Sequence, residues 1–91
     1  MNREELRRKF SSILINTSEE NPLECDIYLD MKDSYGLSSL DMPEIISLFQ
    51  EPSEGIIWIN IKGYPMPIEF DDFLEDDLEY ILKQLLNGKS N

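Results

Sequence analysis

One cysteine is the most reactive side chain in the sequence. Cys25 is the only cysteine of the chain, and there is no histidine. A thiol nucleophile needs a nearby base or positive charge that lowers its pKa. The sequence neighbours of Cys25 are instead the acids Glu24 and Asp26, which disfavour the thiolate. We therefore interpret Cys25 as a small buried hydrophobic residue.

Carboxylates are the second feature that could do chemistry. The stretch 69–79 holds seven acidic residues and no basic one. Calcium sites need an ordered loop spacing with a turn glycine, which this stretch lacks. Glycoside hydrolysis needs a sugar cleft between two carboxylates, and 91 residues leave little room for one. We expect no metal, no cofactor and no catalytic residue, and hence a protein that is not an enzyme.

A serine-containing segment offers an alternative. The sequence YGLSSLDM, residues 35–42, resembles the stretch of acyl carrier proteins in which a G-x-D-S-L-D-like sequence carries phosphopantetheine on its serine. Ser39 stands at the position of that serine. The resemblance covers about eight residues. It implies an all-helical fold and a carrier function with phosphopantetheine on Ser39.

Helical spacing of apolar residues predicts three helices. The first covers residues 3–16 and begins with a capping-box pair, Asn2 and Glu5. The second is short, uses Asp41 and Glu44 as its capping box and stops before Pro52. The third begins at Asp72 and is closed by glycine at residue 88. Its apolar stripe is Leu74, Leu78, Ile81, Leu82 and Leu85.

Alternating apolar residues predict three strands. Residues 23–31 alternate with period two, and residues 56–62 and 64–70 read as a hairpin interrupted by Gly63. The expected fold class is therefore α+β, with the order α-β-α-β-β-α and a three-stranded, mainly antiparallel sheet packed with helices. We expect one domain spanning residues 1–91.

Two surfaces are candidates for binding a partner. Helical geometry places acids and one tyrosine of the last helix on its outer side, and the outward face of the sheet carries aromatic residues rimmed by acids. Two alternatives stay open, namely that a helix covers this face of the sheet and that Tyr80 packs against a loop. The predicted partner-binding residues are Asp26, Tyr28, Asp30, Trp58, Glu69, Asp72, Asp76, Glu79 and Tyr80.

The charge of the chain favours a basic partner. The net charge is −11, and from residue 10 onward 17 acidic residues face four basic ones. Such a field repels nucleic acid and anionic membranes. The longest uninterrupted apolar run has four residues, 56–59, and the charged first ten residues do not look like a signal peptide. With its lone cysteine, the chain suits the cytoplasm.

These observations predict a non-enzymatic acidic binding protein. A compact acidic domain with exposed aromatics can occupy the basic active cleft of a nuclease. The most specific hypothesis is an immunity protein or antitoxin that inhibits a cognate bacterial toxin. The alternatives are the acyl carrier, a nucleic-acid-mimicking phage inhibitor and a small secretion chaperone.

Overall fold

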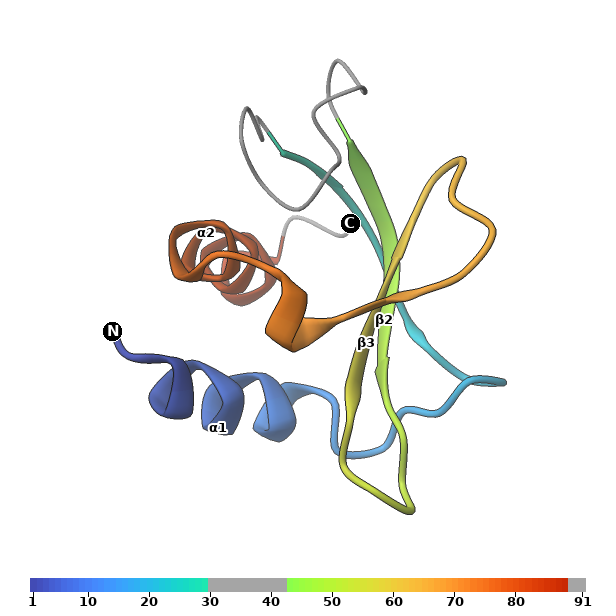
Figure 1. Cartoon of the computed structure of the whole chain (residues 1–91), viewed down its shortest axis with the longest axis horizontal. Coiled ribbons are helices and arrows are strands. Elements are labelled where there is room, and N and C mark those ends of the chain that lie inside the picture. Colours follow the sequence, from blue (N-terminus) through green and yellow to red (C-terminus); the bar gives the residue numbers. More distant parts are fainter. Residues whose placement is uncertain (30–42, 89–91) are drawn as a thin grey trace.

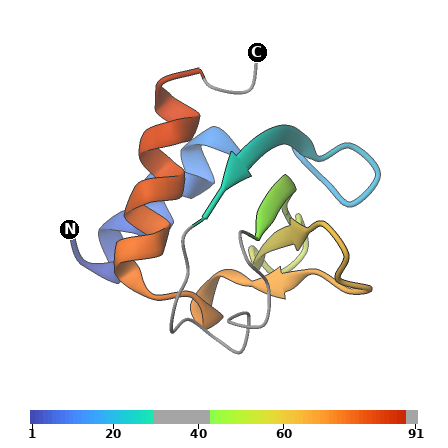
Figure 2. The same ribbon diagram turned by 90° about the horizontal axis from the view of Figure 1, so that it is seen from above.

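A four-stranded antiparallel sheet covered on one face by two helices forms the fold (Figures 1 and 2). The computed structural model describes residues 1–29 and 43–88. The sheet order is β1-β2-β3-β4. The elements in chain order are α1 (Arg3–Ile13), β1 (Leu23–Tyr28), β2 (Glu44–Gln50), β3 (Ile57–Ile61), β4 (Ile68–Glu69), the 3₁₀ turn η1 (Phe70–Asp72) and α2 (Glu75–Leu86).

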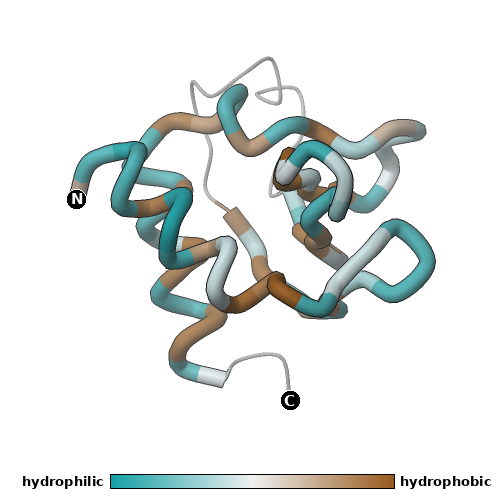
Figure 3. The backbone as a smooth tube through the Cα atoms, turned by 90° about the horizontal axis from the view of Figure 1, so that it is seen from below, coloured by the Kyte–Doolittle hydropathy of each residue, from teal (hydrophilic) through white to brown (hydrophobic). Residues whose placement is uncertain are grey.

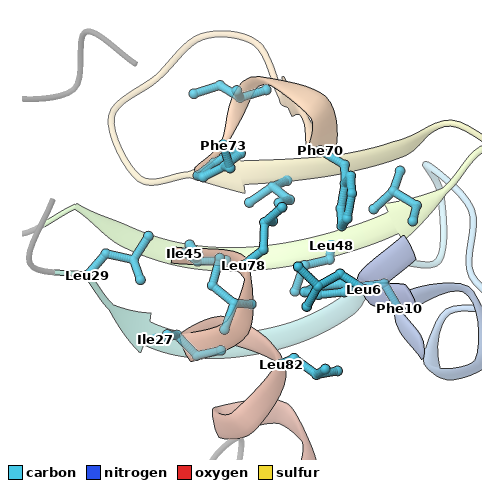
Figure 4. Close-up of a cluster of buried hydrophobic side chains, with 14 of the residues drawn as sticks. Leu6, Phe10, Ile27, Leu29, Ile45, Leu48, Phe70, Phe73, Leu78 and Leu82 are labelled. Atoms are coloured by element: carbon cyan, nitrogen blue, oxygen red, sulfur yellow. The ribbon is translucent and has the colours of Figure 1, made fainter. Parts of the chain in front are cut away.

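The core lies between the helices and the inner face of the sheet. Cross-strand pairing aligns apolar side chains in rows, since directly paired residues point to the same face. One row runs through Leu48 and Ile59 and the other through Ile45 and Ile61, and all four residues are buried. Figure 4 shows side chains from both helices, the sheet and η1 converging on this layer. The hydropathy of the backbone alternates along both helices, as one-sided burial requires (Figure 3).

Helix α1 begins as its sequence predicts. The side chain of Asn2 accepts a hydrogen bond from the backbone N–H of Glu5 at 2.7 Å, which satisfies one free donor of the first turn. The helix buries Leu6 and Phe10 and ends at Ile13, three residues before the predicted end. The carbonyl of the C-cap residue Leu14 accepts hydrogen bonds from the hydroxyl of Thr17 at 2.7 Å and from its backbone N–H at 3.1 Å, so this helix end is satisfied by the following loop.

The predicted second helix is wrong, because residues 44–50 form strand β2. The pairing register with both neighbouring strands is irregular around Ile46, and the extra residue interrupts the alternation of a regular strand. The apolar residues then stand at positions 45, 46, 48 and 49, a spacing that imitates a helix. Glu44 therefore begins a strand and caps no helix.

The α+β class is confirmed, whereas the element order and the strand count need correction. The described order is α-β-β-β-β-α, with four strands in place of three. Strand β1 ends at Tyr28. The predicted hairpin has the right pairing, since Trp58 pairs with Glu69. Its second strand has only two residues, because Pro65 and Pro67 cannot donate hydrogen bonds to the ladder.

Helix α2 begins later than predicted. Its first residue is Glu75, and Leu74 takes the cap position without a side-chain hydrogen bond. Phe70 and Phe73 are both buried in the core, and they hold the segment before the helix in a 3₁₀ turn. Asp72 therefore caps nothing, and Leu74, predicted to be in the core, is 54% exposed. The predicted end is confirmed, since the helix stops at Leu86 and Gly88 has a positive φ of 69°.

Candidate protein-binding surfaces

The predicted partner-binding residues that the structure describes lie on two opposite sides of the molecule. Both described helices pack against the inner face of the sheet, and neither covers the outer face (Figures 1 and 2). Asp72, Asp76, Glu79 and Tyr80 belong to η1 and α2, whereas Asp26, Tyr28, Trp58 and Glu69 belong to the strands. A single flat contact therefore cannot include all of them.

A groove runs along the outer side of α2, and we call it the α2 groove. Its volume is about 490 Å³. Tyr80 lies on it and is 45% exposed, and Met1 and Leu86 add exposed apolar surface. The residues that line it are Met1, Asp76, Glu79, Tyr80, Leu82, Lys83 and Leu86. Aromatic and apolar surface next to carboxylates is typical of protein-binding sites.

The N-terminus and the first helix neutralise only part of the acidity near this groove. The N-terminal ammonium pairs with Glu79 at 3.0 Å, which raises the pKa of the amine. Arg7 pairs with Asp71, and its guanidinium carbon lies 4.8 Å from the centre of the Phe70 ring. Asp72 and Asp76 have no ion-pair partner among residues 1–29 and 43–88. The N-terminal cations thus stabilise the packing of α1 on α2, and two carboxylates stay available to a partner.

The outer face of the sheet carries polar and aromatic residues in rows. Phe49, Trp58 and Glu69 are cross-strand partners in one row. Ser47 and Asn60 pair in a second row, and the Asn60 amide donates to the Ser47 hydroxyl at 2.8 Å. This row is satisfied internally, whereas the aromatic row borders open space.

A carboxyl pair occupies the far end of the same face. Tyr28 and Glu44 are cross-strand partners, and the carboxyl group of Asp26 lies close to that of Glu44. Hydrogen bonding with Asp26, followed by desolvation and the charge of Asp26, raises the pKa of Glu44 above its ordinary value. The same two carboxylates raise the pKa of the Tyr28 hydroxyl. Lys62 lies 3.8 Å from Glu44 and opposes the shift of its pKa.

Cys25 has the environment of an inert thiol. It packs against the core, and its Sγ lies 3.5 Å from the carbonyl oxygen of Ile45, within hydrogen-bonding reach. Burial, followed by the charges of Asp26 and Glu44, raises the pKa of the thiol to about 12. Such a group does not ionise near neutral pH, so Cys25 is unsuited to nucleophilic chemistry.

Several predicted residues are brought together, and others fall outside the described residues. Asp76, Glu79 and Tyr80 line one groove, while Tyr28 lies beside Asp26. Asp30, Ser39 and the predicted cap Asp41 lie outside the described residues. Sequence reasoning missed Glu44, because it was assigned to a helix cap. The all-helical fold that the acyl carrier resemblance implies is not the fold of this chain.

Across the described ranges, no group of three or more carboxylate or cysteine side chains is arranged to hold a metal ion. Neither helix there has the length and apolar character needed to cross a bilayer. Comparisons with protein-family models, with curated proteins and with solved structures gave no match.

Proposed function

We propose that this chain is a non-enzymatic acidic binding protein that neutralises a basic protein, in the manner of an immunity protein or antitoxin against a nuclease-type toxin. The observation that carries the proposal is the α2 groove, where Tyr80 and exposed apolar groups lie beside Asp76, whose carboxylate has no ion-pair partner among the described residues. In a basic nuclease cleft, such carboxylates would take the place of substrate phosphates.

The net charge of −11 supports the same function. Opposite charge on two partners steers their encounter and can raise association rate constants to about 10⁸–10⁹ M⁻¹s⁻¹ at low salt. Aromatic anchors then slow dissociation, because they bury much area at a small cost in conformational entropy. In the α2 groove, the carboxylate of Asp76 supplies the steering charge and Tyr80 supplies the aromatic anchor.

The test begins with capture of the basic partner from the source cell, followed by an assay of the purified partner. Saturating amounts of this chain should abolish the partner's toxic or hydrolytic activity. Asp76→Lys should slow association about tenfold at low salt and much less at about 0.5 M salt. Tyr80→Ala should mainly speed dissociation, at a cost of about 2 kcal/mol.

Glu4→Lys is the matched control for Asp76→Lys. Glu4 is an exposed residue of α1 that does not line the groove, so the variant makes the same charge change away from the groove. Equal slowing by both reversals would show that total charge, not the groove, steers association. A captured protein that keeps its full activity when saturated would contradict the proposed function.

The acyl carrier alternative has a separate test. Incubation with a phosphopantetheinyl transferase and coenzyme A should leave the mass of the chain unchanged. A phosphopantetheine adduct that disappears in Ser39→Ala would replace the proposed function with a carrier function.

A further inference from the structure

The outer face of the sheet contains a second hollow, which we call the Trp58 cleft. Its volume is about 260 Å³. Trp58 and Phe49 reach it from adjacent strands, and the loops on either side, residues 17–22 and 62–67, project on the side of the sheet away from the helices (Figure 1). The residues that line it are Glu19, Phe49, Glu51, Trp58, Met66 and Pro67.

The apolar part of the cleft is built into the sheet. Phe49 is only 6% exposed, although it lies outside the core cluster beneath the helices. Trp58, its cross-strand partner, is half-buried. Both backbones are fixed by strand pairing, so their rings need little ordering when a ligand binds. Pockets for whole small molecules usually measure about 300–1,000 Å³, so this cleft suits a single side chain.

Carboxylates surround this aromatic surface, and no cation of residues 1–29 and 43–88 pairs with them. Glu19 and Glu51 line the cleft, and Glu69 pairs with Trp58 across the strands. None of the three carboxylates has an ion pair or hydrogen bond with a described residue. Because an aromatic ring and carboxylates both attract positive charge, their combination favours a cationic ligand.

We propose that the Trp58 cleft binds an arginine side chain of a basic protein partner. Arginine fits better than lysine for two reasons: its planar guanidinium stacks on aromatic rings and its fork of donors matches carboxylates. The inference rests on the proposed function only for the basic character of the partner. The cleft and the α2 groove lie on opposite sides of the sheet, so each can be tested without the other.

Trp58 itself reports on the cleft, since it is the only tryptophan of the chain. The experiment titrates the full chain, at about 0.15 M salt, with acetylated and amidated hexa-arginine and with the equivalent hexalysine. Hexa-arginine should change the Trp58 emission to saturation and should bind about three- to tenfold more tightly than hexalysine.

Two double variants with equal charge separate the cleft from the overall field. Glu19→Gln with Glu51→Gln removes the two carboxylates that line the cleft and should weaken hexa-arginine binding about fivefold or more. Glu4→Gln with Glu54→Gln removes two exposed charges that do not line the cleft and should weaken it less than about twofold. Thermal melting of each variant confirms that it is folded.

A third variant tests the ring directly. Trp58→Leu should weaken binding of a fluorescently labelled hexa-arginine, measured by anisotropy, whereas Trp58→Phe should retain part of it. Equal losses in the two double variants, or binding that leaves the Trp58 emission unchanged, would overturn the inference. Either result leaves the proposed function standing, because partner inhibition and the Asp76→Lys and Tyr80→Ala variants test that function on the other surface.

Discussion

At the scale of single residues, the pair formed by Asp26 and Glu44 links stability to pH. Hydrogen bonding between the two carboxyl groups favours the protonated acid, and it is the largest cause that raises the pKa of Glu44. Folding thus favours the protonated form of Glu44. The stabilising effect is complete below the unfolded-state pKa, about 4.3 for glutamate, and is lost as the pH rises through the folded-state pKa.

Glu44→Gln should therefore raise the thermal midpoint at pH 7 and raise it much less at pH 4. Glutamine keeps the shape of the protonated acid. It loses the weak pairing with Lys62, whose side chain is 74% exposed, and the charged acceptor for the Tyr28 hydroxyl. Circular-dichroism melts at the two pH values measure the effect. Glu54→Gln, in an exposed turn, is the control for the change in net charge. A midpoint lowered at pH 7 would mean that Glu44 is charged and stabilising there.

A second prediction at this scale concerns Cys25. With a pKa of about 12, the thiol of the folded protein should react with iodoacetamide at pH 8 about 10- to 100-fold more slowly than that of the unfolded chain. Mass spectrometry of samples quenched over time, with and without denaturant, measures both rates. Equal rates would show that the strand edge opens readily and exposes Cys25.

At the scale of elements, the placement of the phenylalanines decides where the last helix begins. The stripe predicted from sequence includes Leu74 and Leu78, but the structure exposes the first and buries the second completely. Leu78→Ala should cost about 2–5 kcal/mol of unfolding free energy, whereas Leu74→Ala should cost less than about 1 kcal/mol. Urea denaturation of both variants checks this. Similar costs would mean that the helix starts near Asp72 after all.

The elements that were predicted well have local causes, and those that were missed do not. Asn2 caps α1 through a contact within its own first turn, and Gly88 follows α2 with a backbone angle that suits glycine. Strand β2 depends instead on an irregularity near Ile46 that exists only through pairing with its neighbours. The start of α2 depends in the same way on tertiary contacts, namely the burial of Phe70 and Phe73 in the core.

Of the two candidate surfaces, one follows from local geometry and the other depends on contacts between distant residues. Helix geometry alone places Asp76 and Tyr80 on the outer side of α2, as the groove confirms. The Trp58 cleft joins Glu19, Phe49 and Met66, which lie far apart in the sequence, so it could not be predicted before β2 was known to be a strand. Sequence alternation identified Trp58 and Glu69 on this face, but not Glu19, Phe49 or Met66.

At the scale of the whole molecule, the charge of −11 should oppose folding. Like charges repel more strongly in the compact state than in the expanded chain, and salt screens them over a Debye length of about 10 Å at 0.1 M. Raising sodium chloride from about 0.01 to 0.5 M should therefore raise the thermal midpoint by several degrees. The four ion pairs of the described residues act in the opposite direction, but all have exposed partners and contribute little.

Reversing the charges of Asp72 and Asp76 should reduce the repulsion within the folded chain. Asp72→Lys with Asp76→Lys changes the net charge by four units and breaks no ion pair among the described residues. The variant should melt at a higher temperature than the natural chain at low salt, and its midpoint should depend less on salt.

Asp76 lies in the first turn of α2, where an acid interacts favourably with the helix dipole. Losing this interaction costs about 0.3–1 kcal/mol and offsets part of the gain at low salt. Because salt screens this interaction as well as the repulsion, the melting temperatures of the two proteins should approach each other at high salt. A midpoint that falls with salt in the natural chain would show that its ion pairs outweigh the repulsion. Asp72 and Asp76 would then have to lie near cations, although neither has an ion-pair partner among the described residues.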